Sequence, residues 1–259
     1  MSNIKGYILD NGRLKGPKQG LIASAGPDEV NEIQMYTILL KHPEGYVLFD
    51  SACHGDAKRL APFMLESVFI NEEDRLLNRL AAIDVTPEDV NYVVLSHMHS
   101  DHTGYIACFP NAEICVSDSE FTGIVKEFAL GVGVNDRDVG YWIPLKLKWK
   151  LIPDDVKTFE LFDGITILNF GPGHSYGMLG MLVDFQKTGK VIIASDAIHS
   201  HENVGPPIDP PGSLVSDEGY HKTIEYIFEL AKKENAAVWF GHDLDQFSGM
   251  VKSTEGFYE

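Results

Sequence analysis

Residues 97–102 read His97-Met98-His99-Ser100-Asp101-His102, and four of these six side chains are of types that bind metal ions. They follow Tyr92-Val93-Val94-Leu95, an apolar run typical of a buried strand. Alternate side chains of an extended chain point to the same side, so His97 and His99 face one way, and Asp101 and His102 point elsewhere as a turn begins. The spacing predicts that one loop serves two neighbouring metal ions. Imidazole and carboxylate ligands suit zinc and similar metals.

Three further segments share one form, in which a short apolar run leads to a residue able to bind metal. The runs 165–170, 191–195 and 237–240 lead to His174, Asp196 and His242, respectively. Open α/β folds place their binding sites at strand ends, so these residues are expected to gather with those of 97–102. Four strand ends would then supply seven ligand groups, a convergence that a chance set of polar loops does not explain.

In this order, the motifs resemble those of the metallo-β-lactamase superfamily. The shared features are the HxHxDH run at 97–102, Pro172-Gly173-His174, the aspartate Asp196 after its apolar run, and Gly241-His242. The resemblance extends over nearly the whole chain, from residues 47–51 to 241–243, and within the superfamily it is nearest to the N-acyl-homoserine lactonases and the related pyridoxolactonase. It implies an α/β (α+β) fold built as a four-layer αββα sandwich, with the site along one edge.

The resemblance also implies which residues bind metal. Its pattern assigns His97, His99 and His174 to one ion, Asp101, His102 and His242 to a second, and Asp196 to both as a bridge. Asp50, after the apolar run 47–49, would support the site by holding the other ring nitrogen of a ligand histidine; an ordinary turn aspartate is the alternative. The implied cofactor is a pair of divalent ions, with Zn²⁺ first and Mn²⁺, Fe²⁺ or Co²⁺ also compatible with these ligands.

Such a pair of ions predicts hydrolysis. Two divalent ions about 3.5–4 Å apart can share a bridging water, and zinc lowers the pKa of a bound water from about 15.7 to about 7. We expect the resulting hydroxide to attack the carbonyl of an N-acyl-homoserine lactone or related small lactone, with Asp101 carrying the proton to the leaving alkoxide. The alternatives are a thioesterase or esterase, a phosphodiesterase on the same site, and a non-catalytic metal-binding sensor domain.

Two positions depart from the lactonase pattern. His199 stands where the lactonases carry a tyrosine that contacts the substrate carbonyl, and Ser100 stands where they often carry an aromatic residue. We expect His199 to take part in catalysis, either as a hydrogen-bond donor to the substrate or close to a metal. Ser100, Tyr176 and His199 are the candidate substrate contacts, with Tyr176 as a replacement hydroxyl or aromatic wall. His201, in the stretch that follows, is more typical of a surface histidine.

The composition is that of a globular protein and argues against some partners. With 259 residues, 44% hydrophobic and 23% charged, the chain is long enough for a single domain over 1–259 with a sizeable core. A net charge of −17 would repel nucleic-acid phosphates, and no run approaches the ~18 apolar residues of a membrane span. The start of the chain lacks the pattern of a signal peptide, and the three cysteines show no disulfide or CxxC spacing. We therefore expect a cytoplasmic protein that binds neither nucleic acid nor membrane.

The segments around these motifs predict further elements. Residues 35–40 and 46–49 flank a turn sequence and form a hairpin signal, and residues 56–83 are expected to be helical. Apolar residues over 224–231 recur with the i, i+3, i+4, i+7 spacing of a helix that packs on the core.

Residues 118–150 fit these patterns least well. They carry apolar and aromatic side chains separated by glycines. As an insertion they would wall the substrate cleft, and the alternative is a helix and loop that complete the core. An exposed aromatic part of this segment would indicate a homodimer.

Overall fold

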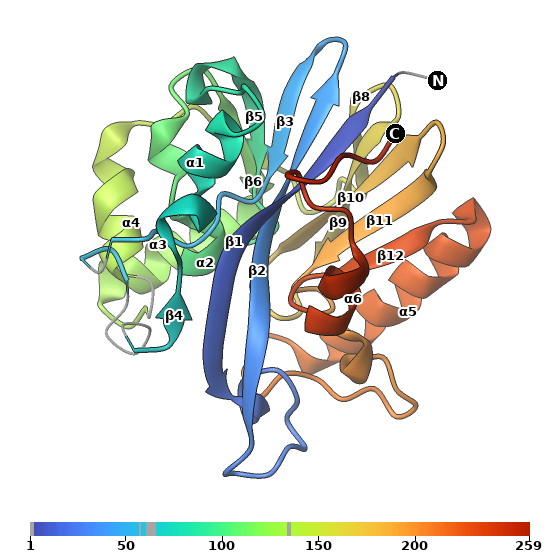
Figure 1. Ribbon diagram of the computed structural model, residues 1–259. Coiled ribbons are helices and arrows are strands. Elements are labelled where there is room, and N and C mark those ends of the chain that lie inside the picture. Colours follow the sequence, from blue (N-terminus) through green and yellow to red (C-terminus); the bar gives the residue numbers. More distant parts are fainter. Residues whose placement is uncertain (1–2, 57, 61–65, 134–135) are drawn as a thin grey trace.

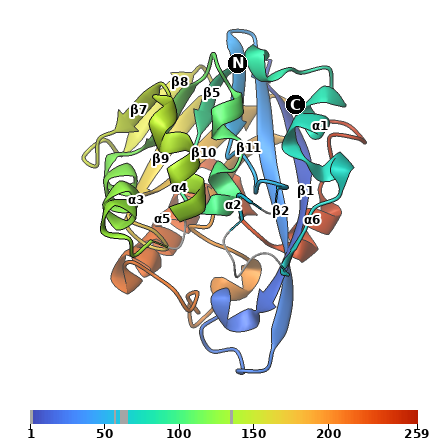
Figure 2. The same cartoon turned by 90° about the vertical axis from the view of Figure 1, so that its left-hand side faces the viewer.

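The computed structural model describes residues 3–56, 58–60, 66–133 and 136–259. These residues form two β-sheets, one of seven strands and one of five, that pack face to face with helices on the outer side of each (Figures 1 and 2). The order of the layers is helix, sheet, sheet, helix. The predicted αββα sandwich is therefore confirmed.

The seven-stranded sheet is built from the first part of the chain, in the order β4-β1-β2-β3-β5-β6-β7. Its strands are β1 (Lys5–Pro17), β2 (Val30–His42), β3 (Gly45–Phe49), β4 (Val68–Phe69), β5 (Val90–Val94), β6 (Glu113–Ser117) and β7 (Trp149–Ile152). β2 and β3 pair antiparallel, which confirms the predicted hairpin, whereas β3, β5, β6 and β7 run parallel. Because β3 and β5 are parallel neighbours, Asp50 and the loop that begins after Val94 lie at the same edge of the sheet.

The five-stranded sheet is built from the later part of the chain, in the order β12-β11-β10-β9-β8. Its strands are β8 (Thr158–Phe162), β9 (Ile165–Gly171), β10 (Met178–Phe185), β11 (Gly189–Ser195) and β12 (Ala237–Phe240). The three apolar runs predicted to precede ligands are confirmed as β9, β11 and β12. β9 and β11 both pair antiparallel with β10, and β12 is parallel to β11, so all three strands end at the same edge.

Helices cover the two outer faces. On the side of the seven-stranded sheet lie α1 (Leu76–Ala81), α2 (Ser100–Thr103), α3 (Asp118–Leu130) and α4 (Asp136–Trp142); α5 (Asp217–Glu234) covers the other sheet, and α6 (Leu244–Gly249) follows β12 (Figure 1). The predicted helix over 224–231 is confirmed within α5, which buries Ile224, Ile227 and Ala231. None of the described helices has the length and apolar content that crossing a membrane requires.

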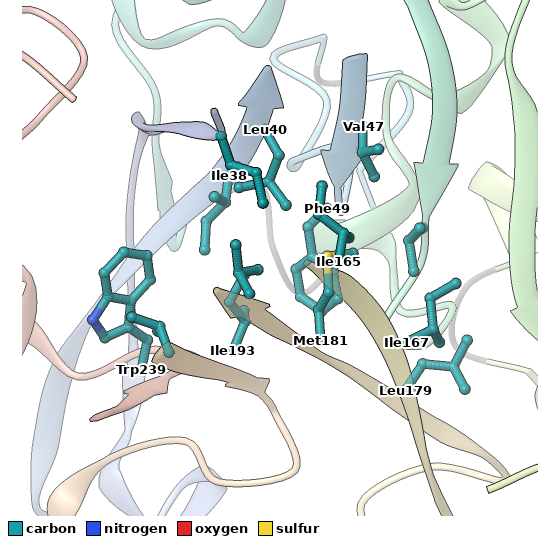
Figure 3. Packing of buried hydrophobic residues seen from close by; sticks show 14 of the residues in the cluster. Ile38, Leu40, Val47, Phe49, Ile165, Ile167, Leu179, Met181, Ile193 and Trp239 are labelled. Carbon is teal, nitrogen blue, oxygen red and sulfur yellow. The ribbon is translucent and has the colours of Figure 1, made fainter. Parts of the chain in front are cut away.

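A core between the sheets fixes their relative position. Figure 3 shows Ile38, Leu40, Val47 and Phe49 of one sheet facing Ile165, Ile167, Leu179, Met181, Ile193 and Trp239 of the other. Full burial of one such side chain stabilises the fold by about 1.5–3 kcal/mol. The packed sheets therefore hold the strand ends of both, and the residues that follow them, in a fixed arrangement.

The structure contradicts the helix predicted over 56–83. Residues 57 and 61–65 lie outside the described part of the chain; the described remainder holds β4, a short 3-10 turn and α1. Val68 pairs with Leu14 and adds a strand to the edge of β1. This pairing is non-local, and it outweighs the local helical pattern because tertiary contacts decide strand formation.

Several described residues of the segment 118–150 pack in the core, while others stay exposed. α3 and α4 form much of the segment, and Ile124, Val139 and Trp142 are buried in the cluster on the outer face of the seven-stranded sheet. The described residues of this segment are absent from the lining of the cavity at the candidate site. The buried residues of the segment complete the core, and the cleft-lining insertion stays a prediction.

Candidate metal centre

Four strand ends bring the predicted ligand residues together at one edge of the sandwich. The loop after β5 carries His97, His99, Asp101 and His102, the turn after β9 carries His174, and β11 and β12 are followed by Asp196 and His242. Among the described residues, four overlapping sets of donor atoms could hold an ion, and the atoms of each set lie within 4.8 Å of one another. Two of these sets are a three-histidine group of His97, His99 and His174 and a mixed group of Asp101, His102 and His242. These are the two groups that the sequence predicted.

The carboxylate of Asp196 lies at the centre of the cluster. Five histidine Nε2 atoms surround its Oδ2, those of His242 at 3.2 Å, His102 and His199 at 3.5 Å, and His97 and His174 at 3.7 Å. Asp196 is only 3% exposed. A buried carboxylate that contacts both groups has the position that a bridging ligand requires.

The distances within the three-histidine group fit a tetrahedral metal ion. Nδ1 of His99 lies 2.9 Å from Nε2 of His97 and 3.1 Å from Nε2 of His174. Ligand nitrogens about 2.0–2.1 Å from a tetrahedral zinc ion are about 3.3–3.4 Å apart. The group needs to open by only roughly 0.2–0.5 Å to accept such an ion.

The mixed group also presents nitrogen lone pairs to the cluster. Nδ1 of His102 lies 2.9 Å from Oδ2 of Asp50, and Nδ1 of His242 lies 2.8 Å from the carbonyl oxygen of Gln34. Because the Nδ1 hydrogen is donated outward, each neutral ring turns the lone pair of Nε2 inward. In the described structure, Nε2 of His102 is buried without a hydrogen-bond partner. A bound divalent ion would satisfy this nitrogen, so the donor set fits a metal.

Asp50 contacts His102 on the ring nitrogen that faces away from the cluster, which is the supporting position expected for it. Its carboxylate also accepts hydrogen bonds from Ser96 N at 2.7 Å, Ser96 Oγ at 2.9 Å and Ser195 Oγ at 3.1 Å. Asp50 and Ser195 have positive φ angles of 61° and 48°, a conformation that costs a non-glycine residue about 1–3 kcal/mol and clusters at functional sites. Sequence reasoning missed both serines, whose only signal was a place near a strand end, and Gln34, which lies within β2.

Protein charges alone favour ionised side chains in the mixed group of Asp101, His102 and His242. Burial by itself would lower the pKa of His102, but the carboxylates of Asp101, Asp50 and Asp196 raise that pKa well above its usual value. Burial would raise the pKa of Asp101, yet the imidazoles of His102 and His242 hold it below its usual value. Protons on the imidazoles therefore offset the buried carboxylates, and a divalent ion would displace those protons on binding.

Glu120 of α3 ties together the two loops of the three-histidine group, and sequence reasoning missed it. Its fully buried carboxylate accepts hydrogen bonds from Met98 N at 2.8 Å, Ser175 Oγ at 2.9 Å and Gly177 N at 3.0 Å. Met98 stands between two of the histidines, and Ser175 follows the third. Burial raises the pKa of Glu120. The sequence signal was an acidic residue on an otherwise apolar helix face.

Replacing Glu120 with glutamine is expected to destabilise the fold by about 1–3 kcal/mol, because the amide turns a donor toward a buried N–H that needs an acceptor. Denaturant unfolding measures this change. Glu127→Gln is the matched control, since Glu127 lies on the same helix and its carboxylate accepts a hydrogen bond from the hydroxyl of Tyr176, at 2.8 Å, rather than from the ligand loops. Equal stability of the two variants would show that Glu120 does not clamp the loops.

A cavity of about 470 Å³ opens onto the cluster. Five candidate ligand residues and His199 form part of its lining. The remaining lining includes Leu14, Lys15, Pro17, Leu21 and Ile33. These belong to the β1–β2 arm, residues 13–33, which projects past the rest of the sandwich (Figures 1 and 2). The arm, which sequence reasoning missed, supplies an apolar wall next to the candidate metal centre.

Of the three predicted substrate contacts, the structure places only His199 in the described lining of this cavity. The hydroxyl of Tyr176 donates to Glu127 of α3, and its ring lies against Gly123, so the side chain faces that helix. Ser100 is 6% exposed within α2 and is not part of the described lining. Neither Tyr176 nor Ser100 lies in the described lining, and their roles as substrate contacts stay predictions.

Comparison with known proteins agrees with this geometry. Residues 31–242 match the model of the family described as the metallo-beta-lactamase superfamily. The chain is 32% identical over 262 residues to the N-acyl homoserine lactonases AiiB of Rhizobium rhizogenes and Agrobacterium fabrum, an alignment that covers 98% of this chain and 94% of each relative.

Solved structures are similar over the full length. A Bacillus thuringiensis AiiA variant with N-decanoyl-L-homoserine bound at its active site superposes with a TM-score of 0.85 at 25% identity, with complete coverage of both chains. An N-acyl homoserine lactone hydrolase with the product N-hexanoyl-L-homoserine at its catalytic metal centre gives the same TM-score, identity and coverage.

Proposed function

The chain belongs to the metallo-β-lactamase superfamily, and from this premise we propose that it is a metal-dependent hydrolase that opens the ring of an N-acyl-homoserine lactone or a related small lactone. The observation that carries the proposal is the buried cluster of seven His and Asp ligand residues at the end of an apolar cavity. The 32% identity to curated N-acyl homoserine lactonases over almost the whole chain supports the substrate class.

We propose two divalent ions, most of all Zn²⁺, for this cluster. The three-histidine group would hold one ion, the mixed group would hold the second, and Asp196 would contact both. The unpartnered Nε2 of His102 and the short nitrogen–nitrogen distances support this assignment. When bound, such ions supply a water that is acidic near neutral pH and a positive charge that polarises the lactone carbonyl.

Asp101 is the proposed proton carrier. Its side chain is 16% exposed, whereas that of Asp196 is 4% exposed, and it lines the cavity. Its Oδ2 lies 3.5 Å from Nε2 of His102 and 3.6 Å from Nε2 of His242. A carboxylate at this place can take a proton from the attacking water and pass it to the alkoxide that leaves as the ring opens. Asp50 would hold His102 in the required tautomer.

The β1–β2 arm is the proposed site for the acyl chain. With the lactone ring at the cluster, the chain would extend along Leu14, Pro17, Leu21 and Ile33. The cavity volume lies within the range of about 300–1,000 Å³ that is typical of small-molecule sites. Burial of each methylene there would contribute about 0.8 kcal/mol to binding.

This proposal is tested by measuring turnover of a panel of substrates. The panel holds N-acyl-homoserine lactones with short to long acyl chains and, for comparison, simple esters, thioesters and a phosphodiester. Ring opening by the metal-loaded protein, with KM falling as the acyl chain lengthens, supports the proposed function. Preference for a thioester, ester or phosphodiester would replace it with the corresponding hydrolase. Full metal occupancy with no hydrolysis of any substrate would indicate a metal-binding sensor.

Filling the cavity should select against long chains. Gly20 lines the cavity, and a Cβ added there meets no atom within 4 Å, so Gly20→Phe introduces a ring without a clash at its base. We expect its KM for long-chain lactones to rise at least about 10-fold, because roughly two methylenes lose their burial. Gly249→Phe on α6 is the control, since it has the same open space away from the cavity. Unchanged KM values for Gly20→Phe would place the acyl chain elsewhere.

We also propose a homodimer through the apolar residues left exposed between 130 and 145. Leu130, Val132, Tyr141 and Leu145 are 65%, 69%, 49% and 48% exposed, and exposed apolar patches are typical of protein interfaces. Sedimentation equilibrium tests this proposal. A dimer that Val132→Glu dissociates supports it, and a monomeric wild-type protein contradicts it.

A further inference from the structure

We infer that His199 is an additional metal ligand, which binds through Nε2 the ion that His174 and Asp196 contact. The inference rests on the proposed metal centre and goes beyond it, because it gives the cluster an eighth ligand residue. His174, Asp196 and His199 form a donor set of their own, with ligand atoms within 4.8 Å of one another.

The position of His199 is fixed by the turns that carry the ligand residues Asp196 and His242. His199 lies three positions after Asp196, in the turn that follows β11. Its carbonyl accepts a hydrogen bond from the backbone N–H of His242 at 2.8 Å, and Ile198 just before it accepts from Gly241 N at 3.0 Å. The turns after β11 and β12 therefore hold each other in place, and His199 has little freedom to leave the cluster.

The ring of His199 lies as close to the centre as the predicted ligands do. Its Nε2 is 3.5 Å from Oδ2 of Asp196, the same distance as for His102 and shorter than the 3.7 Å of His174. The rings of His174 and His199 have centroids 4.6 Å apart and are nearly perpendicular, at 86°. His199 also lines the cavity, so it lies on the side of the cluster from which a substrate would approach.

The burial of His199 is a second, independent observation that supports a metal bond to this residue. His199 is 3% exposed, and its Nδ1 is a buried atom with no hydrogen-bond partner in the described structure. A polar ring buried with so little hydrogen bonding is costly unless another interaction compensates. A metal bond at Nε2 would offset part of the cost of burying the ring, although Nδ1 would then carry the hydrogen and still lack an acceptor. Because no acceptor orients this Nδ1, unlike that of His102 or His242, we expect a weaker bond than at those two histidines.

Metal binding without substrate tests the inference. Metal-depleted wild-type protein and the variants His199→Phe and His201→Phe are titrated with Co²⁺, and zinc affinity is measured by competition with a coloured chelator. His201 is the matched control, since it lies two residues away with a side chain 57% exposed and paired with Asp243. We expect His199→Phe to weaken at least one ion about 10-fold or more and to change the visible Co²⁺ absorption. His201→Phe should change neither.

Equal affinities and spectra for His199→Phe and wild type would overturn the inference and leave His199 as a substrate contact only. A crystal structure of the zinc-loaded wild type gives a second test that needs no variant. An ion about 2.0–2.1 Å from Nε2 of His199 supports the inference, and an ion out of bonding distance refutes it. Neither measurement uses a lactone, so failure of the proposed substrate class would leave the result for His199 unaffected.

Discussion

Replacing Asp196 with alanine is expected to remove bound metal and lower kcat/KM for the lactone at least about 1,000-fold. The reason is its central position: its Oδ2 lies within 3.2–3.7 Å of five histidine nitrogens, in a site where the aspartate is 3% exposed. Without this carboxylate, the cluster loses the negative charge that lies between its histidines and would attract divalent ions. Without the ions, the pKa of the attacking water returns from about 7 toward 15.7, which removes almost all hydroxide at neutral pH.

Metal content and kcat/KM measured on the same sample test this prediction. Asp184→Ala is the matched control, because Asp184 belongs to β10 of the same sheet and pairs across to Lys190, away from the cluster. The control should keep both metal and activity. An Asp196→Ala protein that retains two ions and wild-type turnover would show that this carboxylate does not join the two groups.

The second large effect is expected for Asp101→Asn, with kcat lowered about 100- to 10,000-fold and little change in KM. The amide keeps an oxygen for the ion and nearly the same shape, but it cannot accept and return a proton. Turnover must be compared at full metal occupancy, so that loss of proton transfer is separated from loss of metal. Near-normal kcat in the fully loaded variant would assign the proton transfer to another group.

Asp50→Asn is expected to affect metal binding rather than proton transfer, in contrast to Asp101→Asn. Asp50 lies behind His102 and outside the described lining of the cavity, so its loss should weaken metal binding about 10- to 100-fold while excess metal restores kcat. If excess metal restored Asp101→Asn and failed to restore Asp50→Asn, the two roles would have to be exchanged.

The strand ends were predictable because their signals are local. β5, β9, β11 and β12 are short apolar runs, and each leads to a residue of a metal-ligand type within a few positions. Strand pairing within each sheet and the packing of the two sheets then place those residues at one edge, in agreement with the rule that binding sites lie at strand ends. For this reason the local patterns predicted that the ligand residues gather at strand ends. The layers of the sandwich and the division of the ligand residues into two groups were implied by the resemblance to the metallo-β-lactamase superfamily.

Other parts depend on contacts between distant segments. Part of the helix expected over 56–83 is the strand β4 instead, because Val68 pairs with Leu14, which lies far away in the sequence. The β1–β2 arm reaches the cluster only after both sheets have packed, so no local pattern marked Leu21 or Ile33 as cavity residues. Tyr176 stands next to a ligand loop in sequence, yet its hydroxyl finds Glu127 on α3.

Buried polar partners were the least predictable part of the site. Glu120 reads as one more acidic residue on a helix, and its role appears only when three donors from two loops converge on it. Ser96 and Ser195 come together with Asp50 across the two sheets. Buried polar groups need partners, but the sequence does not say which partners folding will supply.

The central claim is tested most directly by proton release at neutral pH from an N-acyl-homoserine lactone, measured while metal-free protein is titrated with Zn²⁺. A ring-opening hydrolase with a dinuclear centre predicts turnover that rises until two ions are bound per chain and that is absent in His97→Ala. A wild-type protein that holds two ions and releases no proton from any lactone would contradict the claim.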